Sequence, residues 1–286
     1  MSILLALLPA IGLGVLPLLL GKIGGKPINN ILGFGFGSLI IGLIVQLFLA
    51  HDFTTGLSFW LPFLSGVAWI VGQGGQVTSF EVMGVSRTMP ISTGLQLIGT
   101  SVLGVLFFGE WSGLSSKLFG FLAIAILILG AYLTTVNPEQ KEDHSSSNLV
   151  SGVRILLLTS FGYWIFSVVP NMVNASAISI FFPQMLGIFT GAIVYAFVKD
   201  KVSFKSRESW LDGFVGLVFS LSSLVYIFSA QSNGSTLAFI LSQLNVVIST
   251  LGAIFIMKEA KSSKQRRLTY IGLALIVLAS VVTVFL

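Results

Sequence analysis

Ten apolar runs, each close to the length that a membrane-spanning helix needs, follow one another along the 286-residue chain. A helix of about 20 apolar residues crosses a hydrocarbon core about 30 Å thick. The runs fall near residues 3–20, 31–50, 57–77, 87–108, 118–136, 152–170, 178–198, 211–230, 234–257 and 268–285. Only 9% of the residues are charged, whereas soluble domains carry about 25%. The pattern predicts an all-α, polytopic membrane protein with ten transmembrane helices in the lipid bilayer.

The one sizeable hydrophilic stretch, NPEQKEDHSSSN at 137–148, separates two halves of five spans each. Identical residues recur between the halves at a nearly constant offset: Gly12 and Gly162, Gly37 and Gly187, Trp60 and Trp210, and Gly66 and Gly216 at 150 residues, with Glu110 and Glu259 at 149. Five is an odd number, so a duplicated second half must lie upside down relative to the first. We predict two inverted five-helix repeats, 1–136 and 152–286, joined by a cytoplasmic linker at 137–151.

The basic residues are distributed unevenly along the connectors. Fourteen of the fifteen Lys and Arg residues fall after odd-numbered spans, and only Lys117 falls on the other side. The positive-inside rule then predicts that both termini face outward. We interpret the net charge of +5 as a topology signal rather than a nucleic-acid-binding surface. The absence of cysteine excludes disulfides and thiol chemistry.

Two spans carry matched stripes of polar residues. The fourth span has a hydroxyl, an amide and a hydroxyl at i, i+3 and i+7: Thr93, Gln96 and Thr100. A shift of 149 residues places the same order in the ninth span: Ser242, Asn245 and Ser249. A hydroxyl in a membrane helix commonly bonds its own backbone, but an amide has two donors and an acceptor oxygen to satisfy. The two amides are therefore the strongest candidates for contact with a substrate.

No Asp, Glu, Lys, Arg or His falls in the middle of any span, and Asp212 and Glu259 lie at or near span ends. A site of amides, hydroxyls and aromatic rings fits a neutral, hydroxyl-rich molecule such as a sugar. The candidate substrate-binding residues are Gln96, Asn245, Thr93, Thr100, Ser242, Ser249, Gln73, Gln76, Tyr226, Trp69, Tyr163 and Trp164. We also predict that Glu81 and Arg87 pair as a gate at the inner mouth. With both histidines in connectors and no H-E-x-x-H motif, we expect no enzyme, metal or cofactor.

The segment GVSRTMPISTGLQLIGTSVLGVLFFGEW (84–111) resembles the fourth-span signature of the bacterial glucose/ribose uptake family, within the drug/metabolite transporter superfamily. FGYWIFSVVP (161–170) and FILSQLNVVISTLGAIF (239–255) resemble its ribose-uptake members, and GEW (109–111) resembles the glucose branch. The resemblance implies uptake of ribose or glucose across a bacterial plasma membrane, coupled to protons. Because no carboxylate falls in mid-span, facilitated diffusion stays open. An exporter or facilitator of another small neutral metabolite with the same fold is the alternative.

Overall fold

The computed structural model describes residues 3–50, 52–108, 113–136, 145–233, 241–242, 244–259 and 261–284. Within these ranges the regular structure is helical, which confirms the all-α class. The elements are α1 (Ile3–Ile23), α2 (Pro27–Phe48), α3 (Leu57–Met83), α4 (Val85–Phe108), α5 (Leu114–Thr135), α6 (Ser145–Thr159), α7 (Phe161–Val168), η1 (Val169–Met172), α8 (Ala177–Lys199), η2 (Lys201–Lys205), α9 (Arg207–Asn233), α11 (Leu244–Phe255) and α12 (Ser263–Val284). The predicted linker residues 137–144, and Glu110, lie outside the described ranges.

The helices correspond to the ten predicted spans, with α6 and α7 forming one apolar span over Ser147–Val168. Among the described residues seven helices are long and apolar enough to cross a membrane, and α1 and α11 contribute shorter apolar stretches. α4 is long enough at 24 residues but carries its polar residues along most of its length. Large side chains such as Phe48 and Val198 are each 76% exposed. Such an apolar surface is typical of helices that face lipid.

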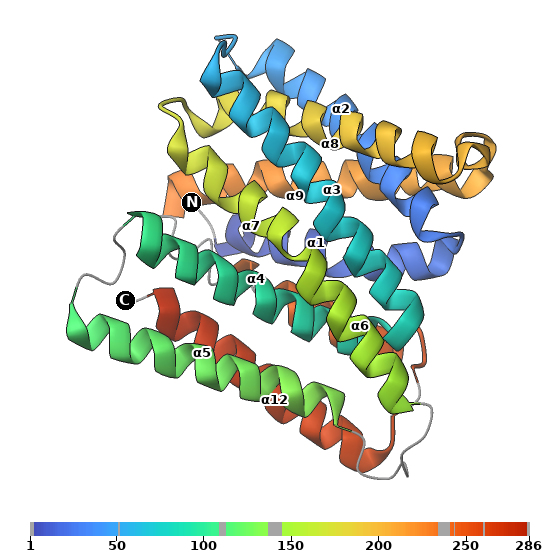
Figure 1. Ribbon diagram of the computed structural model, residues 1–286, viewed down its shortest axis with the longest axis vertical. Coiled ribbons are helices and arrows are strands. Elements are labelled where there is room, and N and C mark those ends of the chain that lie inside the picture. Colours follow the sequence, from blue (N-terminus) through green and yellow to red (C-terminus); the bar gives the residue numbers. More distant parts are fainter. Residues whose placement is uncertain are drawn as a thin grey trace.

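Helices from the two halves alternate in the bundle (Figure 1). α2 packs against α8 and α9, and α3 packs against α8 and the α6–α7 span. α1 packs against α9 and α11, while α5 and α12 form a pair at the lower edge of the view. α4 bridges α11, α5 and α7. The start of α1 and the end of α12 lie on the left side of this view, as expected for an even number of spans (Figure 1).

Two helix crossings are so close that they require glycine. A Cβ at Gly37 on α2 would overlap the backbone of Gly216 on α9, and one at Gly187 on α8 would overlap the backbone around Phe63 and Gly66 on α3. Small residues of this kind allow membrane helices to pack backbone against backbone. The glycines of the second and seventh spans are therefore packing seams.

The largest buried cluster draws on both halves of the chain. Phe34 and Trp69 from the first half pack with Tyr163, Met185 and Phe219 from the second. The ring of Trp69 lies 4.7 Å from that of Phe219 and 5.4 Å from that of Phe34. The two halves thus share one core.

The burial of one acidic residue was not predicted from the sequence. Asp212 lies in the second turn of α9 (Arg207–Asn233), near the beginning of its span as expected, but it is fully buried (0% exposed). Its Oδ2 accepts a hydrogen bond from Asn30 Nδ2 at 2.7 Å, while its Oδ1 is buried without a partner. The reason is the seam with α2, since a Cβ at Gly33 would overlap the backbone and Cβ of Asp212. Span boundaries alone do not reveal this burial.

The seam between α2 and α9 generates a test of the packing. Gly37→Leu should lower the free energy of unfolding by about 3 kcal/mol or more, because the two backbones must separate. Gly213→Leu on the same α9 is the matched control, since a Cβ there meets nothing within 4 Å. Melting curves of the purified variants measure the difference. Equal melting temperatures for the two variants would contradict the seam.

Candidate functional site

A cavity of about 290 Å³ lies at the centre of the bundle. It is lined by Leu13, Leu16, Pro17, Leu20, Phe34, Trp69, Gln73, Gln76, Phe80, Met89, Thr93, Gln96, Leu97, Thr100, Tyr163, Phe166, Ser167, Phe219, Ser223 and Asn245. These residues come from α1, α2, α3, α4, α7, α9 and α11, and so from both halves. The volume is near the lower end of the roughly 300–1,000 Å³ typical of small-molecule sites.

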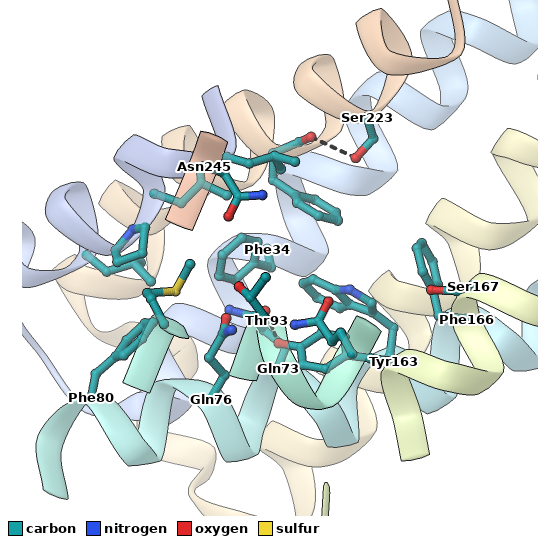
Figure 2. Close-up of a pocket in the computed structure, with 18 of the residues that line it drawn as sticks. Phe34, Gln73, Gln76, Phe80, Thr93, Tyr163, Phe166, Ser167, Ser223 and Asn245 are labelled. Carbon is teal, nitrogen blue, oxygen red and sulfur yellow. Dashed lines mark hydrogen bonds between the residues drawn. The ribbon is translucent and has the colours of Figure 1, made fainter. Parts of the chain in front are cut away.

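The polar wall begins on α3 with two amides, Gln73 and Gln76, only 5% and 8% exposed. Gln73 Oε1 accepts a hydrogen bond from the Tyr163 hydroxyl at 2.7 Å. Gln76 Nε2 donates to Ser92 Oγ at 2.8 Å. Figure 2 shows Gln73, Gln76 and Tyr163 on one side of the cavity. Each amide is thus held by one protein contact and keeps its other end for the cavity.

The stripe on α4 continues this wall. Gln96 Nε2 donates to Ser92 Oγ at 3.2 Å, so two amides meet at one hydroxyl. The Thr100 hydroxyl donates to the carbonyl of Gln96 at 2.8 Å, which is the expected bond back to its own helix. Thr93 is 7% exposed and lines the cavity beside them. All three predicted residues of this stripe therefore lie at the site.

The opposite wall carries the second stripe only in part. Asn245 lines the cavity (Figure 2). Its Nδ2 donates to the carbonyl of Ser242 at 2.8 Å. Ser249 bonds back to the carbonyl of Asn245 at 2.8 Å and does not line the cavity, nor does Ser242. Ser223 adds a hydroxyl to this wall from α9. The amide of the ninth span reaches the cavity, whereas its two hydroxyls do not.

Of the four predicted aromatic residues, two line the cavity and two do not. Trp69 and Tyr163 line the cavity, while Tyr226 does not. Trp164 also lies outside the lining, and its Nε1 donates to the carbonyl of Leu95 at 2.9 Å, which joins α7 to α4. The structure therefore brings eight predicted residues to the cavity: Gln73, Gln76, Thr93, Gln96, Thr100, Asn245, Trp69 and Tyr163.

An apolar wall that sequence reasoning missed faces these groups. Phe34 and Phe219 have ring centroids 5.5 Å apart in an edge-to-face arrangement, and leucines of α1 extend this surface. With 24 phenylalanines in the chain, composition cannot select these two. Within the described part of the chain, no Asp, Glu, Lys, Arg or His belongs to the lining. Among the described residues no group of three His, Cys, Asp or Glu could hold a metal ion.

The end of the bundle that was predicted to be the inner mouth contains a residue that was not assigned a role from the sequence. Glu259, in the loop after α11, accepts hydrogen bonds from the backbone N–H groups of Val85 and Ser86 at 2.7 and 3.1 Å. These are orphan donors at the first turn of α4, where a carboxylate is also favoured by the helix dipole. Gly84, with φ +82°, makes the turn that presents them. The contact ties the loop after α11 to the start of α4.

The predicted gate residues lie close to this contact. Glu81 is exposed and Arg87 is half-buried, and no ion pair joins them in this conformation; Lys26–Asp200 is the ion pair recorded among the described residues. Burial lowers the pKa of Lys261 to about 8, with nearby Arg87 adding to the lowering and Glu259 opposing it. The gate role of Glu81 and Arg87 stays a prediction.

A protein family and several bacterial relatives match this chain over nearly its whole length. The family profile described as "Sugar transport protein" matches residues 4–286. A protein of Lactobacillus helveticus named "Putative sugar uptake protein" is 41% identical and covers 99% of this chain and 100% of its own. Proteins of Latilactobacillus sakei and Staphylococcus aureus, both named "Putative ribose uptake protein RbsU", are 41% and 39% identical. Each alignment covers 100% of this chain and 98% of the relative.

A solved crystal structure shares the fold at only 13% sequence identity. Its TM-score is 0.66, and the match covers 98% of this chain and 96% of that one. This likeness concerns the arrangement of the helices alone. The assignment rests instead on the family match over nearly the full length and on relatives at about 40% identity. The chain belongs to the sugar transport protein family.

Proposed function

We propose that this protein is a secondary transporter that takes up a neutral monosaccharide, ribose or glucose, across the bacterial plasma membrane by alternating access. The observation that carries the proposal is the uncharged cavity between the halves, with amides on both sides and aromatic rings between. An anionic or cationic substrate would need a buried opposite charge. A sugar needs hydroxyl partners and an apolar surface for its C–H face.

The free ends of the amides support a hydroxyl-rich substrate. Gln76 and Gln96 use their Nε2 atoms within the protein, as does Asn245 its Nδ2. Their carbonyl oxygens are left to accept hydrogen bonds from substrate hydroxyls, which can donate. Gln73 is held by its oxygen and offers its NH₂ group instead. The cavity therefore offers both acceptors and a donor, as several adjacent hydroxyls require.

The packing supports an inverted repeat as the basis of the mechanism. Gly37 contacts Gly216, and Gly187 contacts Gly66. Adding 150 to 37 gives 187, and subtracting 150 from 216 gives 66, so the repeat offset relates one contact to the other. These matched contacts join α2 to α9 and α3 to α8. In inverted-repeat transporters the two halves are related by a pseudo-two-fold axis in the membrane plane. Access alternates when one repeat rocks against the other around the fixed site.

A second matched pair of contacts obeys the same offset. A Cβ at Gly12 on α1 would overlap Ser222 on α9, and one at Gly162 in α7 would lie 2.7 Å from the backbone N of Gly72 on α3. Adding 150 converts 12 to 162, and subtracting 150 converts 222 to 72. Two independent helix pairs are thus related by one operation, which is what duplication and inversion produce.

The inner mouth gives the alternating-access proposal a gate. Val85 and Met89 of α4 pack with Val246 and Ala253 of α11, and Glu259 fastens the same end. Under the positive-inside orientation this end faces the cytoplasm. The conformation is then closed inside, and opening must break the Glu259 contact.

The uncharged lining also favours a second candidate function, namely facilitated movement of another small neutral metabolite in either direction. Proton coupling distinguishes the two. Uptake against a sugar gradient, driven by an imposed inward proton gradient in proteoliposomes, supports the coupled monosaccharide transporter. Equilibration without accumulation supports the facilitator.

The amides provide the test of the binding site. Gln96→Leu or Asn245→Leu should weaken sugar binding about 5- to 150-fold, since an unpaired hydroxyl in a dry site costs about 1–3 kcal/mol. The fold should tolerate leucine in a membrane helix. Thr190→Val is the control, because its hydroxyl bonds the carbonyl of Leu186 on its own helix away from the cavity. Lower melting temperatures with unchanged Kd would mean that the amides only join helices.

Glu259 provides the test of the inner gate. Glu259→Ala removes two hydrogen bonds to a carboxylate. A hydrogen bond to a charged group contributes about 1.5–3 kcal/mol, so the inner mouth should open more often. Met89→Cys, introduced into the cysteine-free chain, reports this opening through thiol labelling in inside-out vesicles. Labelling should become about 10-fold faster or more. Glu81→Ala in the same background tests the predicted Glu81–Arg87 pair by the same labelling measurement. Equal labelling rates of Met89→Cys with and without Glu259 would contradict the gate.

The orientation of the bundle is tested with two single cysteines. Thr55→Cys lies between α2 and α3, and Lys201→Cys between α8 and α9, both at exposed positions. An impermeant thiol reagent added to intact cells should label only Thr55→Cys, because basic loops are retained in the cytoplasm. Labelling of Lys201→Cys alone would reverse the proposed topology.

A further inference from the structure

Ser92 connects two amides of the cavity without lining the cavity itself. It lies on α4 one turn before Gln96 and is fully buried (0% exposed). Its Oγ accepts hydrogen bonds from Gln76 Nε2 at 2.8 Å and from Gln96 Nε2 at 3.2 Å. Side chains from α3 and α4 therefore converge on a single hydroxyl oxygen.

This arrangement determines which end of each amide faces the cavity. Gln76 Oε1 and Gln96 Oε1 have no hydrogen-bond partner in the described protein. Among the described residues, the side-chain atoms that are both fully buried and without a partner are Gln46 Nε2, Asp212 Oδ1 and Thr250 Oγ1. The two glutamine oxygens are not among these atoms, so they are not fully buried. Both glutamines line the cavity. The two unpartnered oxygens are therefore open to it.

A serine hydroxyl disfavours the arrangement in which both amides are reversed. An amide is nearly symmetric in shape, so a free glutamine could present either its oxygen or its NH₂ group. Ser92 has two lone pairs and a single proton. Its oxygen can accept hydrogen bonds from the NH₂ groups of both amides at once. If the amide oxygens were turned toward it instead, its single proton could be donated to only one of them. A second reversed amide would set two oxygens against each other.

We propose that Ser92 is a positioning residue that sets substrate specificity, by holding Gln76 and Gln96 with their acceptor oxygens toward the cavity. The inference rests on the proposed sugar-binding function of this cavity. Tyr163 holds Gln73 in the opposite sense, because its hydroxyl donates to Gln73 Oε1 and leaves the NH₂ group free. The wall then selects groups that donate to the two acceptors. It accepts a hydroxyl and rejects a fluorine or a methoxy group, neither of which can donate.

Monodeoxyfluoro sugars provide the matching probe, since fluorine replaces one hydroxyl and cannot donate. We suggest measuring Kd for D-ribose and D-glucose on the purified full chain, then for each monodeoxyfluoro analogue of the sugar that binds more tightly. The wild type should bind at least one analogue about 10-fold or more weakly than the parent sugar. In Ser92→Ala both amides are free to turn, so this penalty should fall below about 3-fold. Ser92→Thr retains the hydroxyl and should retain the penalty.

Ser160→Ala is the matched control, because Ser160 is 1% exposed, bonds the carbonyl of Leu156 and lies outside the cavity lining. It should leave the fluorine penalty unchanged. A wild-type penalty in Ser92→Ala, with or without a lower melting temperature, would show a merely structural serine and overturn the inference. Wild-type binding of the parent sugar and of every analogue with equal affinity would also overturn it while leaving the proposed function intact. Binding of neither sugar would overturn both.

Discussion

The close approach of α2 to α9, and of α3 to α8, is the constraint on which the rest of the structure depends. At Gly37 and Gly187 the neighbouring backbones leave no room for a Cβ. Lipid supplies no hydrophobic force that would bring helices together, so association relies on such contacts and on interhelical hydrogen bonds. These seams hold four helices as a scaffold. Trp69 and Phe219 then meet in its centre and form one wall of the cavity.

The amides of the cavity are held at one end by neutral protein groups rather than by charges, and their other ends stay available to a substrate. Ser92 receives two amides, and Tyr163 holds a third. A buried charge in this position would bind a counter-ion or demand a partner of opposite sign, whereas neutral dipoles can exchange their partners for substrate hydroxyls. The site can therefore be dry and polar without binding ions strongly. This matches the chemistry expected of a family that transports sugars.

The sequence was sufficient for the helices, because an apolar run of about 20 residues satisfies its own backbone hydrogen bonds in lipid by forming a helix. It also predicted Gln96 and Asn245, which line the cavity, because an amide has more hydrogen-bonding groups than one backbone carbonyl can pair. It could not separate them from Ser249, whose hydroxyl is too short to leave its helix and bonds the carbonyl of Asn245. The contact of Glu259 with Val85 joins residues 174 positions apart, so only the assembled bundle reveals it.

The shared core has a consequence for the synthesis of the chain. The α2 surface around Gly37 meets its partner only after α9 has been made, because the seam lies against Gly216. Until then the first five helices hold a groove of exposed backbone and an unmatched Trp69 in the membrane. Many multidomain proteins fold their N-terminal part first, as a finished unit. Here the early helices complete their packing only after the late helices have been inserted. Until then, lipid or the insertion machinery must cover the glycine surface of the nascent first half.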